Sequence, residues 1–165
     1  MKHLLLMRHA TALEKVPGQT DLDRDLSPLG HGQALTAGLW LKEKNLVPDL
    51  IFCSPAVRTQ STLAGVLAGL GVSVPVQTER DIYHGDEEDM KHLLDTIDPA
   101  VETLLLIGHN PTIGYLAQAL TGRRLLFSPA TILSLTHKVK EEGDNNAIDF
   151  MVQDRFIAPA DSFLG

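Results

Sequence analysis

Residues 104–111, "LLLIGHNP", repeat the pattern of residues 4–11, "LLLMRHAT": a short apolar run that is followed by a histidine. Each run has the length of a strand. A strand that is buried on both faces has a continuous hydrophobic sequence. His9 and His109 stand at matching places after their runs. We therefore expect two parallel-type strands that carry their histidines to one edge of a sheet.

Strand-like and helix-like segments alternate along the rest of the chain. Ser27 before Pro28 is typical of a helix start, and Gly71 and Gly122 are typical of helix ends. The apolar residues of the first expected helix recur near helical spacing and are expected to face the core: Leu29, Leu35, Leu39, Trp40 and Leu41. The expected strands cover residues 2–7, 49–53, 72–77, 102–107, 131–136 and 147–152. The expected helices cover residues 27–45, 56–70, 87–97 and 111–120.

This alternation predicts a mostly parallel sheet with helices on both faces, a three-layer α/β/α sandwich. The last two expected strands flank a polar hairpin, "KEEGDNN", residues 140–146. The chain of 165 residues is long enough for one core, and no linker or repeat divides it, so we expect a single domain over residues 1–165.

The composition narrows the classes of function. The net charge of -7 argues against a nucleic-acid partner, because such proteins need a basic face. No apolar run approaches the length of a signal-peptide core or a membrane span, so we expect no membrane partner. The single cysteine, Cys53, excludes an internal disulfide and suits a reducing compartment. A soluble cytoplasmic protein is the expectation.

Three of the expected strands end in residues that carry chemistry. The first ends at Arg8 and His9, the second leads to Ser54 and then Arg58, and the third ends at His109. Ligands of open α/β sheets bind beyond the carboxyl ends of the strands. Two guanidinium groups there would grip an oxyanion, and a neutral imidazole is a nucleophile that can accept a phosphoryl group. The second histidine can stabilise the charge that moves during the transfer. This set needs no metal and no cofactor.

Four motifs resemble those of the histidine phosphatase superfamily, which has the phosphoglycerate-mutase-like fold. They are "MRHAT" at 7–11, "RDLSPLGHGQA" at 24–34, "CSPAVRTQST" at 53–62 and "IGHNPTIG" at 107–114. Among its members, the small SixA-type phosphohistidine phosphatases are the most similar. The resemblance covers nearly the whole chain. It implies that His9 is the phosphorylated nucleophile and that Arg8, Arg58 and His109 complete the phosphate pocket, with Ser54 and Thr62 as further matched positions.

The chain departs from the family pattern at two places. Ala10 stands where the family usually has glycine, which an alanine can replace if the backbone there is unstrained. Larger members carry a glutamate general acid in the region that corresponds to "DIYHGDEED", residues 81–89, and no clean match is present. Tyr83 and His84 fall near the expected place, and Asp86 and Glu87 lie just beyond it.

The missing acid favours one class of substrate. A sugar alkoxide needs a positioned proton donor to leave, whereas the imidazole of a phosphohistidine is a much better leaving group. The short chain also leaves no room for insertions that would lid the pocket. We therefore expect a phosphatase that acts on a phosphohistidine-bearing protein, such as a histidine phosphotransfer domain. The alternatives are a phosphatase for small phosphate esters, with Asp86 or Glu87 as the acid, and a phosphate-binding module without turnover.

Two other motifs suggest chemistry less strongly. "DLDRD", residues 21–25, is interpreted as a solvated acidic loop before a helix cap, with a gating role left open by its position near the first strand end. "CSPAVR", residues 53–58, lacks the spacing of cysteine-dependent phosphatases, which have five residues between cysteine and arginine. Cys53 is therefore expected to be an inert packing residue.

Overall fold

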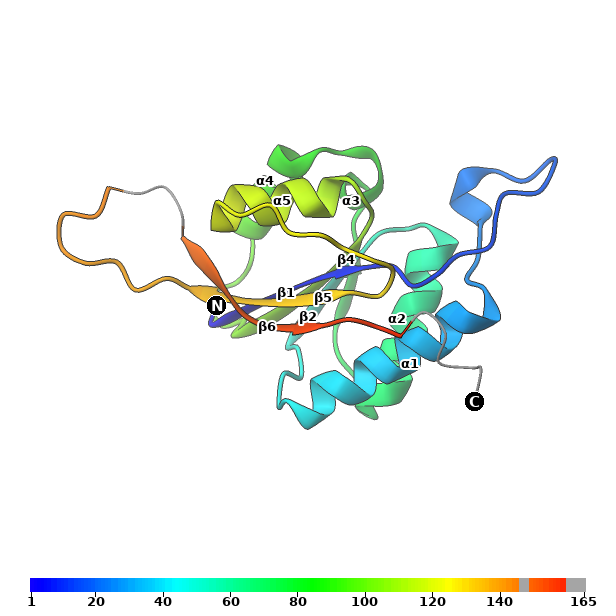
Figure 1. Cartoon of the computed structure of the whole chain (residues 1–165), viewed down its shortest axis with the longest axis horizontal. Coiled ribbons are helices and arrows are strands. Elements are labelled where there is room, and N and C mark those ends of the chain that lie inside the picture. Colours follow the sequence, from blue (N-terminus) through cyan, green and yellow to red (C-terminus); the bar gives the residue numbers. More distant parts are fainter. Residues whose placement is uncertain (146–148, 160–165) are drawn as a thin grey trace.

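One six-stranded sheet organises the protein, whose computed structural model describes residues 1–145 and 149–159. The strand order is β3-β2-β4-β1-β5-β6 (Figure 1). The neighbours β3, β2, β4 and β1 pair in parallel, and β5 and β6 continue the sheet in antiparallel fashion. The strands are β1 (His3–Arg8), β2 (Leu50–Cys53), β3 (Val76–Thr78), β4 (Thr103–Gly108), β5 (Ile132–His137) and β6 (Phe150–Phe156).

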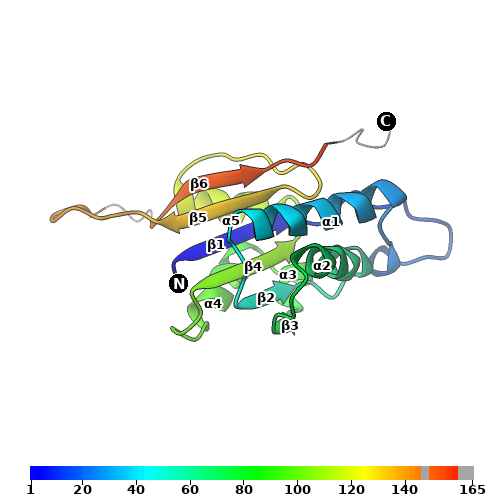
Figure 2. The same ribbon diagram turned by 90° about the horizontal axis from the view of Figure 1, so that it is seen from below.

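Helices cover both faces of this sheet, which confirms the expected three-layer α/β/α architecture. Helices α1 and α2 pack on one face, and α3, α4 and α5 pack on the other (Figures 1 and 2). The helices are α1 (Pro28–Glu43), α2 (Val57–Leu70), α3 (Asp81–His84), α4 (Glu87–Asp95) and α5 (Thr112–Thr121), with a short 3-10 helix, η1 (Asp21–Asp23), before α1.

The sequence signals for helix ends are confirmed. The Ser27 hydroxyl accepts a hydrogen bond from the Gly30 amide at 3.1 Å, as an N-cap does. Gly71 and Gly122 adopt the left-handed conformation that ends α2 and α5. The short elements η1 and α3 were not expected, and the first residues of the expected strand 147–152 lie partly outside the described residues.

The expected core face of α1 is wrong in part. Leu35 and Leu39 are 43% and 51% exposed, while Ala34, Ala37 and Gly38 are buried. The reason is the close approach of α1 to α2. A Cβ atom at Gly38 would lie 2.2 Å from the carbonyl oxygen of Val66, so the small residues of α1 form the helix contact and two of its leucines face outward.

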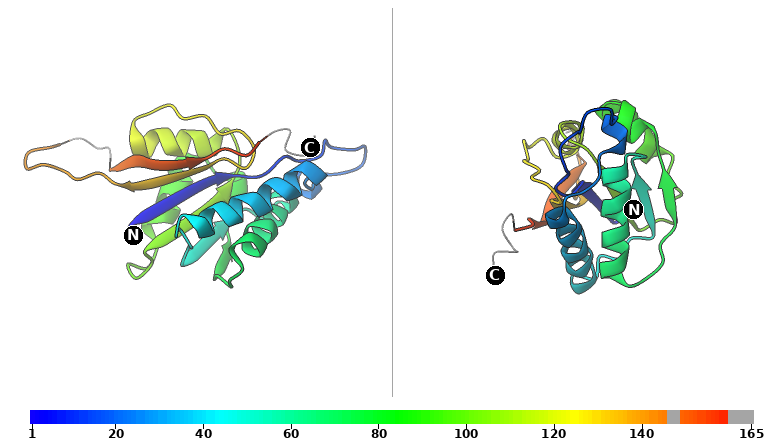
Figure 3. Two further views of the ribbon diagram at one scale, coloured as in Figure 1. Left: turned by 60° about the horizontal axis from the view of Figure 1, so that its bottom comes forward. Right: turned by 90° about the vertical axis from the view of Figure 1, so that its right-hand side faces the viewer.

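The register of β1 and β4 explains the repeated pattern in the sequence. The two strands lie side by side in parallel, with Leu4 opposite Leu104 and Arg8 opposite Gly108. Within each run, alternate residues point to opposite helical layers, which is why both runs are apolar throughout. The histidines that follow therefore leave the sheet at the same level. The segment that links β1 to α1, drawn in blue, lies at this edge (Figure 3).

Candidate active site

His9 and His109 meet at the carboxyl edge of the sheet. Their ring centroids are 5.4 Å apart, with the planes tilted by 57°. The backbone holds this geometry, because the His9 amide donates to the Gly108 carbonyl and the His9 carbonyl accepts from Ala130. The two matching runs of sequence thus deliver two imidazoles to one site, as their pattern predicts.

The imidazole of His9 has one nitrogen available for chemistry. Its Nδ1 lies 2.7 Å from the carbonyl oxygen of Ala10. A carbonyl can only accept, so Nδ1 carries the proton and the lone pair is on Nε2. The ring is 9% exposed. Burial, followed by the positive charges of Arg58, Arg8 and Arg24, lowers the pKa of His9 to about 4, against the opposing effect of the Ala10 hydrogen bond. His9 is therefore neutral and nucleophilic at pH 7.

His109 is oriented by a serine on the neighbouring strand end. Its Nε2 lies 2.7 Å from the Ser54 hydroxyl, which also accepts a hydrogen bond from the Ala56 amide. The hydroxyl has one hydrogen and two acceptor lone pairs, so it can donate to Nε2, and in that tautomer the ring proton of His109 is on Nδ1. Burial and the nearby charge of Arg58 lower the pKa of His109 to about 3. His109 is therefore uncharged at pH 7, and in the tautomer with Nδ1 protonated it can donate one hydrogen bond through that atom.

Arg58 comes from the first turn of α2 and is 6% exposed. Its Nη1 donates to the backbone carbonyl of Asp21 at 2.8 Å, and its Nη2 pairs with the Asp21 carboxylate at 3.0 Å. Arg8, at the end of β1, donates through Nη1 to the Phe127 carbonyl at 3.0 Å. The two guanidinium groups are thus held in place from opposite sides, by η1 and by the segment before β5.

The segment "DLDRD" is solvated as expected, with the Asp21 side chain 47% exposed, and Asp21 also contacts the site. Its carboxylate accepts hydrogen bonds from Arg58, from Arg24 at 3.2 Å and from the Tyr83 hydroxyl at 2.7 Å. The Tyr83 hydrogen bond is the largest of the effects that lower the pKa of Asp21 to about 2. Asp21 is therefore a fixed anion beside the site. Sequence reasoning missed it because Arg58 lies 37 residues away along the chain.

Among the residues considered as a general acid, Tyr83 borders the site. Its ring stands edge-on to His109 at 5.5 Å between centroids, and the Arg58 guanidinium carbon lies 5.9 Å from its centroid. The His84 ring stands edge-on to Tyr83, 4.8 Å between centroids. Asp86 has a different task, since it is the N-cap of α4 in a reciprocal capping box with Asp89, and Glu87 is in the first turn of that helix.

A further matched position, Thr62, supports the backbone around His9. The Ala10 amide donates to the Thr62 hydroxyl at 3.0 Å, and that hydroxyl donates to the Arg58 carbonyl at 2.7 Å. Thr62 thus ties the nucleophile to the helix that carries Arg58. Ala10 is fully buried and does not have a positive φ, so the backbone tolerates alanine where the family usually has glycine.

The absence of a side chain at Gly108 makes room for α3. A Cβ atom there would lie 3.1 Å from the Cγ2 atom of Ile82, which is tighter than ordinary packing. Ile82 is the buried residue of α3, and it adjoins Tyr83. The glycine before His109 therefore lets the short helix with Tyr83 approach the sheet.

Several polar atoms at the site are buried and have no hydrogen-bond partner among the described residues: Arg8 Nε, Arg58 Nε and His109 Nδ1. Buried donors in folded proteins nearly always have an acceptor. All three belong to residues close to His9, and an anion with several oxygen atoms would provide acceptors for them. In the described residues, no group of three histidine, cysteine or carboxylate side chains could hold a metal ion.

The other sequence expectations concern Cys53 and the membrane. Cys53 is fully buried, and burial raises the pKa of its thiol to about 12, so it is a packing residue as expected. No helix in the described part of the chain is long and apolar enough to cross a membrane.

Comparison with known proteins places this site in a family. Residues 4–96 match the family model of the histidine phosphatase superfamily (branch 1). A phosphohistidine phosphatase SixA homolog from Haemophilus influenzae is 30% identical over 146 residues, which cover 81% of this chain and 87% of that protein. An uncharacterized protein of Mycobacterium leprae is 34% identical over 102 residues, which cover 62% of this chain and 61% of that protein.

Solved structures share the fold. A candidate phosphohistidine phosphatase SixA from Nakamurella multipartitia superposes with a TM-score of 0.81 at 27% identity, over 96% of this chain and 97% of that one. The protein histidine phosphatase SixA in complex with tungstate superposes with a TM-score of 0.78 at 23% identity, over 93% of this chain and 95% of that one. Both comparisons extend over nearly the whole chain and agree with the three-layer fold.

Proposed function

Because the chain belongs to the histidine phosphatase superfamily, we propose that it is a phosphatase that forms a phosphohistidine intermediate on His9 and hydrolyses phosphohistidine on a partner protein. The observation that carries this proposal is the pairing of a neutral His9, whose Nδ1 bonds the Ala10 carbonyl and whose Nε2 makes no hydrogen bond to a described residue, with two guanidinium groups and a second imidazole. The similarity to a SixA homolog supports the choice of substrate.

In the first step, Nε2 of His9 attacks the phosphorus atom of the substrate. The bond between phosphorus and the substrate nitrogen breaks as the bond to Nε2 forms. The departing imidazole keeps the electron pair and leaves as a neutral ring when its other nitrogen already carries a proton. Arg8 and Arg58 balance the charge of the phosphoryl oxygens, and Nδ1–H of His109 donates to one of them as charge moves.

In the second step, a water molecule attacks the phosphorus atom of phosphorylated His9. The bond to Nε2 breaks, the electron pair returns to that nitrogen, and inorganic phosphate leaves after the water has lost a proton to solvent. The hydrogen bond from Nδ1 to the Ala10 carbonyl keeps the ring in the same orientation through both steps. His9 is thereby regenerated.

The groups that surround the site support this choice of substrate class. Asp21 is held as an anion by Arg58, Arg24 and Tyr83, and the Tyr83 hydroxyl donates its hydrogen to Asp21. Asp86 is occupied as a helix cap. None of these carboxyl groups is a protonated acid poised for an alkoxide leaving group. A phosphoramidate, whose leaving group is an imidazole, suits this arrangement better than a sugar phosphate.

Trapping the intermediate tests the mechanism. The protein is mixed with phosphohistidine labelled with ³²P and denatured in alkali, which preserves phosphorus–nitrogen bonds. We expect label on the wild type and none on His9→Ala, because the acceptor nitrogen is gone. His92→Ala removes an exposed histidine of α4 and is the control that keeps the label. Labelling of His9→Ala at the wild-type level, or no labelling of the wild type, would refute the proposed function.

A substrate comparison tests the leaving group. A phosphohistidine peptide and glucose 6-phosphate are offered to the wild type at equal concentrations, and release of phosphate is followed. The peptide should be hydrolysed faster. Faster release from the sugar phosphate would overturn the choice of phosphohistidine and favour an esterase role.

A further inference from the structure

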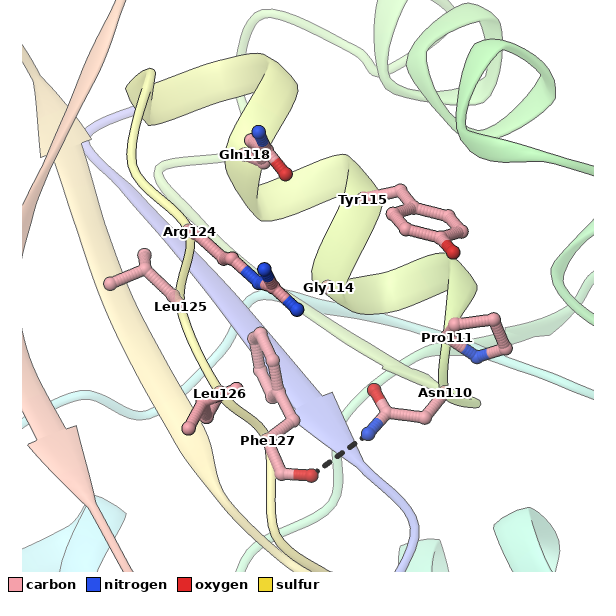
Figure 4. A pocket seen from close by; sticks show the side chains of 9 residues that line it. All are labelled: Asn110, Pro111, Gly114, Tyr115, Gln118, Arg124, Leu125, Leu126 and Phe127. Atoms are coloured by element: carbon pink, nitrogen blue, oxygen red, sulfur yellow. Dashed lines mark hydrogen bonds between the residues drawn. The ribbon is translucent and has the colours of Figure 1, made fainter.

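A small pocket lies beside the phosphate site, between the start of α5 and the segment 124–127 (Figure 4). Asn110 and Gly114 line its α5 side, and Arg124 and Phe127 line the opposite side. Figure 4 shows the Arg124 side chain extending across the pocket toward Gly114, with the Phe127 ring beside it. The residues that the mechanism uses do not include Arg124.

The pocket shares a residue with the candidate active site, because Phe127 lines the pocket and also contacts Arg8. The Phe127 carbonyl accepts a hydrogen bond from Asn110 at 2.9 Å and another from Arg8 at 3.0 Å. One wall of the pocket therefore holds a phosphate-site arginine, and Asn110 directly follows His109. A substrate protein whose phosphohistidine binds at Arg8 therefore has this pocket next to it.

The size of the pocket limits what can enter. Its volume is about 190 Å³. Sites for small molecules have volumes of roughly 300 to 1,000 Å³, so this space suits one side chain of a larger partner. Gly114 contributes to the room, since a Cβ atom there would meet nothing closer than the Leu125 carbonyl oxygen at 3.8 Å.

The positive charge of Arg124 in the pocket favours an acidic side chain of the partner. Within the described residues, Arg124 has no carboxylate within salt-bridge distance, in a protein whose net charge is -7. A guanidinium group matches a carboxylate through two parallel hydrogen bonds. Phe127 and Leu125 provide apolar contacts for an aliphatic stem, and the exposed Tyr115 and Leu126 extend that apolar surface around the pocket.

We propose that this pocket binds an acidic side chain, a glutamate or an aspartate, that the substrate protein presents near its phosphohistidine. The proposal rests on the proposed function and adds a determinant of substrate choice. Arg124 pairs with the carboxylate, and the apolar wall contacts the stem. The partner is thus recognised by an acidic residue beside the phosphorylated histidine, although the enzyme as a whole is negatively charged.

Two synthetic peptides provide the test. Both carry a chemically phosphorylated histidine, which is flanked on each side by glutamates in one peptide and by glutamines in the other. The measured quantity is the ratio of kcat/KM for the glutamate peptide to that for the glutamine peptide. Free phosphohistidine, assayed in parallel, reports the state of the phosphate site in each variant.

We expect the wild type to prefer the glutamate peptide by about tenfold and Arg124→Glu to lose or reverse that preference. Arg123→Glu makes the same change in net charge at an exposed neighbour that does not line the pocket, and it should keep the preference. No preference in the wild type, an unchanged ratio in Arg124→Glu, or an equal loss in Arg123→Glu would overturn the inference. Failure of the wild type to hydrolyse free phosphohistidine would instead refute the proposed function.

Discussion

The surroundings of His9 fix both its tautomer and its charge, as a nucleophile requires. A single hydrogen bond to the Ala10 carbonyl fixes its tautomer, and burial together with two neighbouring guanidinium groups keeps it uncharged. The same groups that would attract a phosphoryl group therefore also protect the lone pair that attacks it. No further base is needed to activate the nucleophile.

Titration of His9 checks this arrangement. Because its pKa is lowered to about 4, the ring should stay neutral as the pH falls from 7 to 5, a range in which an unperturbed histidine with a pKa of about 6.5 becomes protonated. Side-chain ¹⁵N NMR spectra, assigned with His9→Gln, should show one protonated and one unprotonated nitrogen at pH 5. A midpoint near pH 6.5 would contradict the burial argument.

The residues that the sequence alone could identify are those in contiguous motifs at strand ends. Arg8, His9, Arg58 and His109 were expected together on that basis, and the structure places them at one sheet edge. Asp21 and the Phe127 carbonyl were not expected. Asp21 contacts Arg58 across 37 residues, and a backbone acceptor such as Phe127 has no signature in its side chain.

At the scale of elements, apolar runs and caps predicted strands and helices well, and contacts between helices were predicted poorly. The signals at Ser27, Gly71 and Gly122 are local and were confirmed. The buried face of α1 depends on how close α2 comes, and the tightest contact is made by Gly38. Hydrophobicity alone predicted that the larger leucines of α1 are buried. The distance between two helices depends on both of them, so it cannot be read from either sequence segment.

Helix α5 contains a glycine that its packing does not require. Gly114 does not have a positive φ, and an added Cβ would make only ordinary contacts. Gly114→Ala should raise the free energy of unfolding by about 0.5 to 1 kcal/mol, because alanine loses less conformational freedom in a helix. Urea denaturation measures the change.

Gly38→Ala is the matched control for this effect, with the opposite sign. Its Cβ would lie 2.2 Å from the Val66 carbonyl oxygen, so α1 and α2 must separate. We expect a loss of about 1 to 3 kcal/mol, as for other overpacked positions. If Gly38→Ala proved as stable as Gly114→Ala, the close packing of α1 on α2 would be disproved.

For the whole molecule, the two buried histidines of the site make folding stability depend on pH. The pKa values of His9 and His109 are lowered to about 4 and about 3, below the value of about 6.5 in an unfolded chain. Between these limits the unfolded state binds more protons than the folded state. Folding stability that is present above pH 6.5 is therefore lost as the pH falls toward 4.

Urea denaturation at two pH values tests this linkage. The free energy of unfolding should fall by about 3 to 4 kcal/mol between pH 7 and pH 5. His9→Gln and His109→Gln each remove one titrating ring, so each variant should show a smaller difference between the two pH values than the wild type. Equal differences in all three proteins would show that the buried histidines do not control acid stability.

The burial of Cys53 has a consequence for the behaviour of the enzyme under oxidative stress. Peroxide attacks thiolates, and the one thiol of this chain is enclosed in the core with its pKa raised to about 12. The proposed nucleophile is an imidazole, which does not pass through the sulfenic acid states that inactivate thiol-based phosphatases. Hydrolysis by this chain should therefore persist after a peroxide treatment that inactivates a phosphatase with a cysteine nucleophile.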